Sequence, residues 1–87
     1  MEINKISKAG TVESNDIYIV MMPNPEGGIE LELESIVMKQ FGEEIRRVIL
    51  ETLGNLEVKN AIVKAQDKGA LDYTIKARVE TAVKRAQ

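Results

Sequence analysis

The architecture of this 87-residue chain follows from residues 17–34, which read IYIVMM (Ile17–Met22), PNPEGG (Pro23–Gly28) and IELELE (Ile29–Glu34). β-Branched, aromatic and aliphatic residues dominate the first segment, as in a strand buried on at least one face. The second segment is rich in residues that form turns. The third alternates aliphatic residues with glutamates, so one of its faces is apolar and the other is acidic. We therefore predict that the two strands pair as a hairpin with one face exposed to water.

A second, tighter hairpin is expected on the N-terminal side of this segment. Ala9–Val12 can form a short strand, and the four residues Glu13–Asp16 that separate it from Ile17 all favour turns. Ser14 would then lie at the tip of a polar turn. The alternative is that residues 1–16 form a frayed arm.

After residue 34 the spacing of the apolar residues changes from two to three or four, which indicates an amphipathic helix. We expect Ser35 to be the N-cap of this helix and Gly54 to end it. Its apolar stripe consists of Val37, Phe41, Ile45, Val48 or Ile49, and Leu53.

Residues 58–66 alternate as a further strand, with Ala61, Val63 and Ala65 facing inward. A second helix is expected after Asp67 or Lys68, with Asp67 as its candidate cap and Gly69 in the turn at its entrance. Its apolar stripe consists of Leu71, Ile75, Val79, Ala82 or Val83, and Ala86. The element order β-β-β-α-β-α predicts a single α+β domain over residues 1–87, a small two-layer sandwich in which two helices cover one face of a mostly antiparallel sheet.

The composition narrows the range of functions. With no cysteine and no histidine, the chain has no thiol nucleophile, no thiolate metal site and no imidazole base. Together with the short length, this disfavours an independent enzyme and favours a subunit, a carrier or a binding module. The formal net charge is -2, and the basic residues are scattered along the chain, so we expect no nucleic-acid binding.

Membrane and metal signals are also weak. No apolar run approaches the roughly 18 residues that a membrane-spanning helix needs. Residues 1–9 contain two lysines but no apolar block after them, so we expect no signal peptide and a cytoplasmic location. Glu30, Glu32 and Glu34 could collect a hard cation weakly, but a solvated acidic face explains them better, and we predict no metal site.

The three serines differ in setting. Ser7 lies in a polar arm. Ser35 superficially resembles the Asp-Ser-Leu attachment site of ordinary acyl carriers, but those carriers are helical bundles, and we interpret Ser35 as a helix cap. Ser14, at the tip of an exposed turn, would be accessible to a separate modifying enzyme, although most turn serines serve only the turn itself.

Three blocks of the sequence resemble the citrate lyase acyl carrier proteins, the gamma subunits of that complex. The first is A-G-T-x-E-S-x-D, present here as Ala9–Asp16, and the second is V-x-K-Q-F-G-x-x-I-R at Val37–Arg46. The third combines D-K-G-A-L-D at Asp67–Asp72 with A-R-x-E at Ala77–Glu80. Asn15 stands where the family has glycine, and both residues tolerate a positive φ. The resemblance covers nearly the whole chain.

The resemblance implies an acyl carrier subunit without catalytic residues of its own. In that family the serine of the first block, here Ser14, carries a 2'-(5''-phosphoribosyl)-3'-dephospho-coenzyme A group through a phosphodiester bond. The thiol of this group holds an acetyl group, which is exchanged for citrate on the alpha subunit, an acyl transferase. The beta subunit, a citryl lyase, then releases oxaloacetate and restores the acetyl carrier. The reactive sulfur thus belongs to the cofactor. The implied partners are these two subunits and the transferase that attaches the group.

Two alternatives remain open. The carrier subunit of malonate decarboxylase bears a similar group on a serine, although the first block here fits the citrate lyase pattern better. The chain could instead be an unmodified adaptor that docks through Glu30, Glu32 and Glu34. Such an adaptor would never acquire a covalent group, and Ser14→Ala would leave its activity unchanged.

Overall fold

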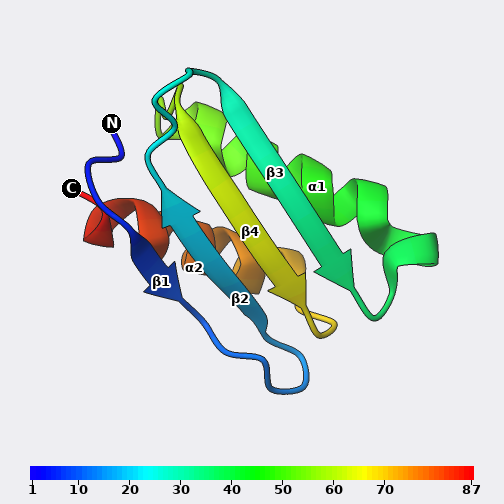
Figure 1. Ribbon diagram of the computed structural model, residues 1–87. Helices are drawn as coiled ribbons and strands as arrows, with labels where there is room; N and C mark the ends of the chain where they lie inside the picture. Colours follow the sequence, from blue (N-terminus) through cyan, green and yellow to red (C-terminus); the bar gives the residue numbers. More distant parts are fainter.

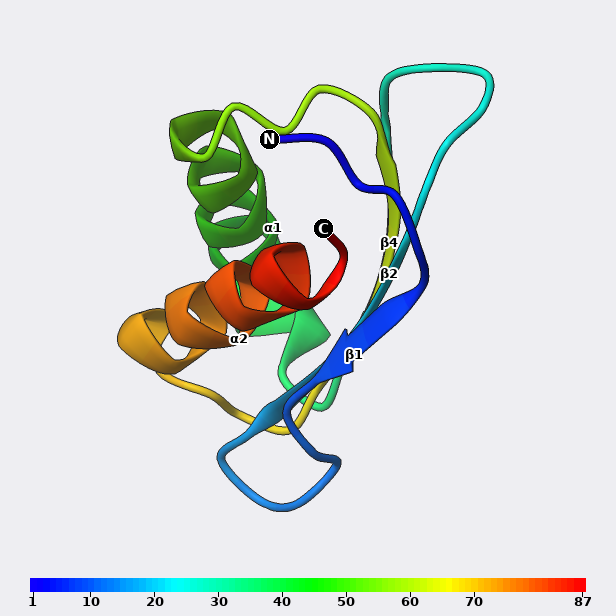
Figure 2. The same cartoon turned by 90° about the vertical axis from the view of Figure 1, so that its left-hand side faces the viewer.

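Two helices cover one face of a four-stranded sheet (Figure 1), and Figure 2 shows both helices on the same side of the sheet. The computed structural model describes all residues from 1 to 87. The elements are β1 (Ser7–Ala9), β2 (Ile17–Met22), β3 (Ile29–Ser35), α1 (Met38–Asn55), β4 (Ala61–Asp67) and α2 (Asp72–Arg85). The predicted α+β class and the order β-β-β-α-β-α are confirmed.

The strands are arranged in the order β1-β2-β4-β3, so β4 lies between β2 and β3. β2 is antiparallel to both β1 and β4, whereas β3 runs parallel to β4. The predicted hairpin between residues 17–22 and 29–34 is therefore wrong. Alternation determines which face of a strand is buried but does not choose its neighbour. The six residues 23–28 can extend to about 20 Å, enough to pass over the ~10 Å that one intervening strand occupies.

β4 suits the centre of the sheet because its inward residues are small or β-branched. Ala61, Val63 and Ala65 are buried beneath the helices, as predicted. The strand begins at Ala61, three residues later than predicted, because Val58 already belongs to the connection that leaves α1. Its hydrogen bonds to β2 on one side and to β3 on the other leave no edge exposed.

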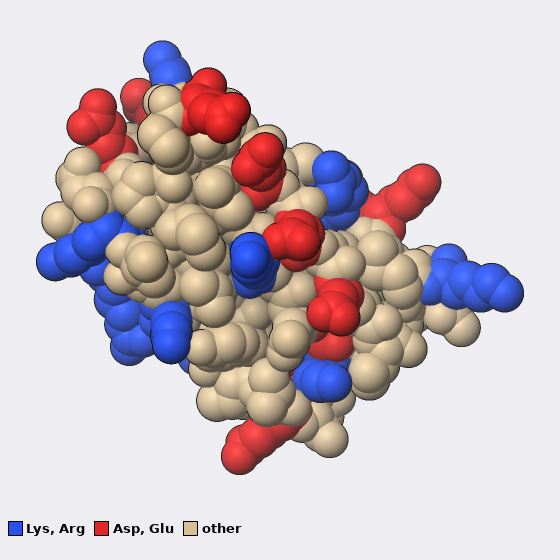
Figure 3. All heavy atoms as spheres, viewed as in Figure 1, with Lys and Arg blue, Asp and Glu red and all other residues tan.

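No helix covers the outer face of the sheet (Figure 1), and this face carries acidic side chains along β3 (Figure 3). Glu30, Glu32 and Glu34 are exposed there, as their alternation predicts. Lys64 lies opposite Glu32 on β4, with its Nζ 3.6 Å from the Glu32 Oε2 atom. Both side chains are more than half exposed, so this ion pair contributes little to the free energy of folding.

The N-terminal segment is part of the fold and does not form a frayed arm. Ile3 is buried, and the Asn4 amide donates a 2.8 Å hydrogen bond to the carbonyl of Ala86. The expected N-terminal hairpin is present, but its first strand is Ser7–Ala9 and not Ala9–Val12. The strand ends where Gly10 adopts φ 83°.

Both predicted ends of α1 are wrong. The helix begins at Met38, with Val37 at the N-cap position and no side-chain cap. Ser35 ends β3 instead, where its hydroxyl serves a different contact described below. Gly54 lies inside the helix, and Glu57 takes the left-handed conformation, φ 57°, that follows its last turn.

The core lies between the sheet and the two helices. β2 contributes Ile17, Ile19 and Met21, which have no exposed surface. The helices contribute Ile45, Val48, Ile49, Leu53, Ile75, Val79, Ala82 and Val83. Two residues of the predicted helical stripes, Phe41 and Leu71, are 56% and 59% exposed instead. Neither helix is long and apolar enough to cross a lipid bilayer.

Candidate functional site

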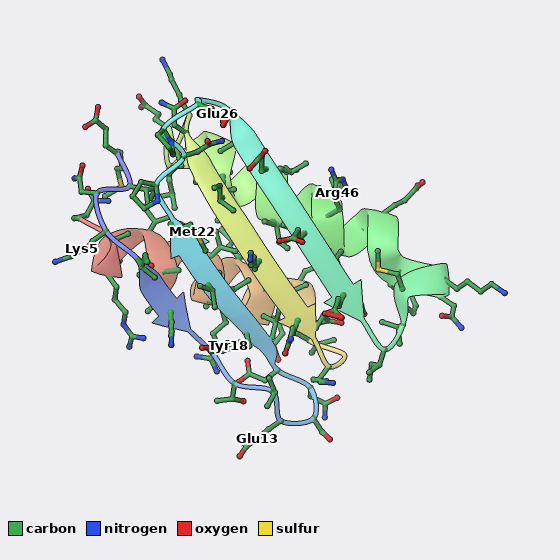
Figure 4. The ribbon with its side chains drawn as sticks, viewed as in Figure 1. Lys5, Glu13, Tyr18, Met22, Glu26 and Arg46 are labelled. Atoms are coloured by element: carbon green, nitrogen blue, oxygen red, sulfur yellow. The ribbon has the colours of Figure 1, made fainter.

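Ser14 lies in loop 10–16, which connects β1 to β2 at one end of the sheet. The turn 13–16 is closed by a 3.1 Å hydrogen bond from the Asp16 amide to the Glu13 carbonyl, and Asn15 adopts φ 66°. The predicted polar turn and the positive φ at Asn15 are thus confirmed. Ser14 is exposed. In Figure 4 the adjacent Glu13 marks the outer end of this loop and points away from the sheet, at the opposite end of the molecule from Glu26.

The three serine hydroxyls have different surroundings. The Ser7 hydroxyl is buried and donates to the carbonyl of Ala82 at 2.7 Å. The Ser35 hydroxyl donates to Asp67 Oδ2 at 2.8 Å and accepts from the Val37 amide at 3.0 Å. Ser14 differs from both, because it is exposed and its hydroxyl makes no hydrogen bond with the rest of the chain. A modifying enzyme can therefore reach Ser14 without breaking a contact of the fold.

Asp16 holds the loop on the side of α2. Its carboxylate accepts a 2.7 Å hydrogen bond from the Thr11 hydroxyl, one from the Ile17 amide and two from Arg78. The hydrogen bond from Arg78 is the main reason that the pKa of Asp16 falls to about 2. Thr11 in turn accepts from the Glu13 amide at 3.2 Å. These contacts fasten both sides of the turn that presents Ser14.

Gly10 makes this arrangement possible. A β-carbon at residue 10 would overlap the carbonyl oxygen of Ile17, and its φ of 83° is one that only glycine adopts freely. The close approach of the two backbones at the base of the loop thus requires glycine.

Two main-chain hydrogen bonds join loop 10–16 to the β4–α2 connection. The Asn15 amide donates to the Lys68 carbonyl at 2.8 Å, and the Lys68 amide donates to the Asp16 carbonyl at 2.9 Å. They continue the β2–β4 ladder beyond the ends of the two strands. The residue that follows Ser14 is therefore hydrogen-bonded to the residue directly after β4, one of the two inner strands of the sheet.

Asp67 links the same connection to the β3–α1 turn. This residue is 1% exposed, and its carboxyl group accepts hydrogen bonds from the Ser35 hydroxyl and from the amides of Gly69 and Ala70. The prediction that Asp67 caps the second helix is wrong, because α2 begins at Asp72 with Leu71 at the N-cap position. Asp67 instead closes the turn before the helix. Gly69 lies in that turn with φ 91°, as predicted.

An apolar groove of about 590 Å³ lies between the N-terminal parts of α1 and α2, next to this turn. Its walls include Val37, Phe41 and Ile45 on one side and Leu71 and Tyr73 on the other. The exposure of Phe41 and Leu71, which their helical spacing does not predict, is explained by this groove, because both side chains line it and lie outside the core.

Reasoning from residue types did not identify Gly10, Thr11, Asp16 and Arg78 as supports of the Ser14 loop. Their roles depend on contacts between residues up to 62 positions apart, which no local pattern reveals. The available signal was that all four fall within the quoted blocks, at Ala9–Asp16 and Ala77–Glu80. The structure shows that these two blocks meet in space at Asp16 and Arg78.

Comparison with known proteins shows the family of this chain. Residues 4–86 match the family model described as malonate decarboxylase delta subunit (MdcD). The chain is 56% identical to the citrate lyase acyl carrier protein of Streptococcus mutans over 86 residues, which cover 99% of this chain and 84% of that one. It is 50% identical to the protein of the same name from Halothermothrix orenii, with coverage of 99% and 90%. The chain belongs to the citrate lyase acyl carrier protein family.

A third citrate lyase acyl carrier protein, from Vibrio cholerae, is 51% identical over 99% of this chain and 88% of its own. The resemblance drawn from the three sequence blocks is therefore confirmed. A chain in the crystal structure of a Pseudomonas malonate decarboxylase hetero-tetramer in complex with malonate superposes with a TM-score of 0.78. The two sequences are 14% identical over 98% of this chain and 87% of the other, so this likeness shows a shared fold.

Proposed function

We propose that this chain is the acyl carrier subunit of citrate lyase and that Ser14 carries the covalent 2'-(5''-phosphoribosyl)-3'-dephospho-coenzyme A group. The assignment to Ser14 rests on the different hydrogen bonding of the three serine hydroxyls. Ser7 and Ser35 donate hydrogen bonds that hold the fold together, whereas the exposed hydroxyl of Ser14 has no partner in the chain. A phosphodiester at Ser14 would replace no contact.

The residues around Ser14 fit the attachment of a large group. The turn is fastened by Asp16 on one side and by the Asn15–Lys68 hydrogen bond on the other, so the attachment point is firmly held. Ser14 itself lies at the surface, where a bulky substituent meets no buried neighbour. A rigid base with an exposed hydroxyl is what a tethered carrier requires.

The attached group would supply a thiol that holds acyl groups as thioesters, and this chain would supply the serine to which the group is attached. We infer that the exchange of acetyl for citrate takes place on the alpha subunit and the cleavage to oxaloacetate on the beta subunit, so that this chain is not itself an enzyme. Tethering gives each active site an effective concentration of roughly millimolar. The absence of histidine and cysteine fits a chain whose reactive sulfur is external.

We further propose that the partners are these two subunits and the transferase that attaches the group, all in the cytoplasm. The support is that the relatives are named after citrate lyase. The formal charge of -2 gives no reason to expect a nucleic acid among the partners.

The test combines intact mass with one substitution and its matched control. The chain purified from its native host should carry the mass of the added group on the peptide that contains Ser14. Ser14→Ala should abolish both the added mass and citrate cleavage by the reassembled complex, while the melting temperature stays nearly unchanged. Ser35→Ala should keep the added mass and lower the melting temperature.

Two outcomes would contradict the proposal. An unmodified chain in cells that ferment citrate would favour the adaptor that docks through the acidic face of β3. A group found on Ser35 would show that the site assignment is wrong.

A malonate decarboxylase carrier is the second candidate, because the matching family model is described as the malonate decarboxylase delta subunit. Identities of 50–56% to citrate lyase carriers favour the first candidate. Binding of the modified chain to a citrate lyase alpha subunit, but not to a malonate transferase subunit, would distinguish the two.

A further inference from the structure

The groove between α1 and α2 is aromatic as well as apolar. The chain contains three aromatic residues, and two of them, Phe41 and Tyr73, lie in this groove. Their side chains are 56% and 72% exposed, so neither is used to fill the core. Exposed aromatic rings that face one groove offer flat surfaces on which a planar ring can stack.

The groove begins next to the attachment loop. Gly69 lines it, and a β-carbon added at Gly69 would lie 3.7 Å from Asn15 Oδ1. Asn15 directly follows Ser14 and is hydrogen-bonded to Lys68, directly before Gly69. A group attached to Ser14 therefore starts beside the mouth of the groove.

The ionisable acids that line the groove are two carboxyl groups. Glu44 on α1 and Asp72 on α2 bring two carboxyl groups together there. Arg47 donates two hydrogen bonds to Glu44 and holds the pKa of that carboxyl at about 2, while the interaction with Glu44 raises the pKa of Asp72. These charges favour a neutral ligand with an amino donor and disfavour phosphate or an acidic peptide segment.

We propose that this groove binds the adenine ring of the group attached to Ser14, with the ring packed against Phe41 and Tyr73. This inference rests on the proposed function. In that group the phosphoribosyl unit joins the serine to the 2' position of the adenosine, so adenine is the base nearest to Ser14. Its exocyclic amine is a donor that suits Asp72 and Glu44. The phosphates and the thiol arm then remain outside the groove.

Docking of the adenine would shorten the mobile part of the arm. Only the portion beyond the adenosine would then move between active sites. A shorter tether raises the effective concentration of the thioester at each site, provided that the tether still spans the distance. The carrier would thus gain a defined direction for its arm at no cost to the core.

The experiment compares chains with and without the group by NMR, after intact mass has confirmed modification of Ser14. We expect nuclear Overhauser contacts between the adenine H2 and H8 protons and the rings of Phe41 and Tyr73, with shifts of both rings relative to the unmodified chain. Tyr73→Ala should lower the ratio of docked to free adenine on the order of tenfold, since one stacking partner is lost. Ile6→Ala changes a residue that is also mostly exposed (64%) but lies outside the groove, and it should leave this ratio unchanged.

The outcomes separate the two proposals. An unmodified Ser14 would overturn the proposed function. A confirmed adduct whose adenine resonances match free adenosine monophosphate, with unshifted groove residues, would overturn the docking inference alone. Groove resonances that move only when the alpha or beta subunit is added would assign the groove to a partner protein and would also overturn the inference.

Discussion

At the scale of single residues, the conformation of loop 10–16, which presents Ser14, depends on a few side chains that make several contacts each. Asp16 receives hydrogen bonds from Thr11, Ile17 and Arg78, which belong to the loop, to β2 and to α2. Gly10 allows the loop to leave β1 in direct contact with the backbone of Ile17. The side chain of Ser14 is exposed and takes no part in these contacts, so its modification would leave them intact.

Gly10→Ala should destabilise the protein by more than Gly28→Ala. Both glycines have φ 83°, but a β-carbon at Gly28 meets no atom within 4 Å, whereas one at Gly10 overlaps the Ile17 carbonyl. Gly28→Ala should cost only the backbone strain, about 1 to 2 kcal/mol. Urea unfolding of the two variants measures the difference, and equal losses would contradict the assigned close contact.

Asp16 should make the stability depend on pH in the acid range. Its pKa is about 2 in the folded chain against an ordinary value of 3.8, so the unfolded chain takes up the proton first as the pH falls. The stabilisation is complete above about pH 4 and is lost between pH 4 and pH 2. Asp16→Asn should lose about 1 to 2 kcal/mol at pH 7, and this gap should narrow as the pH falls below 4 and close at about pH 2. Thermal unfolding of both proteins across this pH range measures the difference in stability. A difference that stayed constant with pH would contradict the role of Asp16.

At the scale of elements, three connections meet at one end of the sheet: the β1–β2 loop, the β3–α1 turn and the β4–α2 turn. The main chain of Lys68 joins the first to the third, and Asp67 joins the second to the third. Neither link lies within a helix or a strand pair, yet together they place Ser14 beside the groove. The connections, more than the regular elements, therefore shape the candidate site.

Asp67→Ala should be more destabilising than Ser35→Ala. The first removes a buried acceptor and leaves the donors of Ser35, Gly69 and Ala70 without their partner. We expect a loss of about 3 kcal/mol for Asp67→Ala and about 1 kcal/mol for Ser35→Ala, measured by chemical denaturation. A smaller effect at Asp67 would mean that the turn does not depend on this carboxyl group.

At the scale of the whole molecule, the strand order determines which backbone amides are best protected from hydrogen exchange with water. β2 and β4 are hydrogen-bonded on both sides, whereas β1 and β3 form the edges of the sheet. Placing β4 in the centre also brings the end of β4, and hence Lys68, next to the Ser14 loop. If β2 and β3 paired directly, β4 would be an edge strand.

Native-state hydrogen exchange should reflect this order. The backbone amides of β4 and β2 should exchange slowest. The amides of the three-residue edge strand β1 should exchange faster than these, by a factor on the order of ten or more. Rapid exchange along β4 would contradict its central position. The measurement thus tests the feature of the fold that the local pattern misassigned.

The amino-acid pattern alone was enough for the α+β class, the order of the elements, the inward faces of the strands and the exposed turn with Ser14. These features depend on residues that are close in the chain, such as the alternation in residues 29–34 and the turn formers in residues 13–16. The family was also recognisable from its motifs, without any knowledge of contacts.

The tertiary structure decided what local patterns cannot encode. The insertion of β4 between β2 and β3, the use of Ser35 and Asp67 as links between turns, and the exposure of Phe41 and Leu71 all depend on which segments become neighbours. A strand offers the same hydrogen-bonding edge to any partner, and a helical stripe does not reveal where a groove stays open between two helices. Long-range packing settles both, because it selects the arrangement that buries the most apolar surface while pairing every buried polar group.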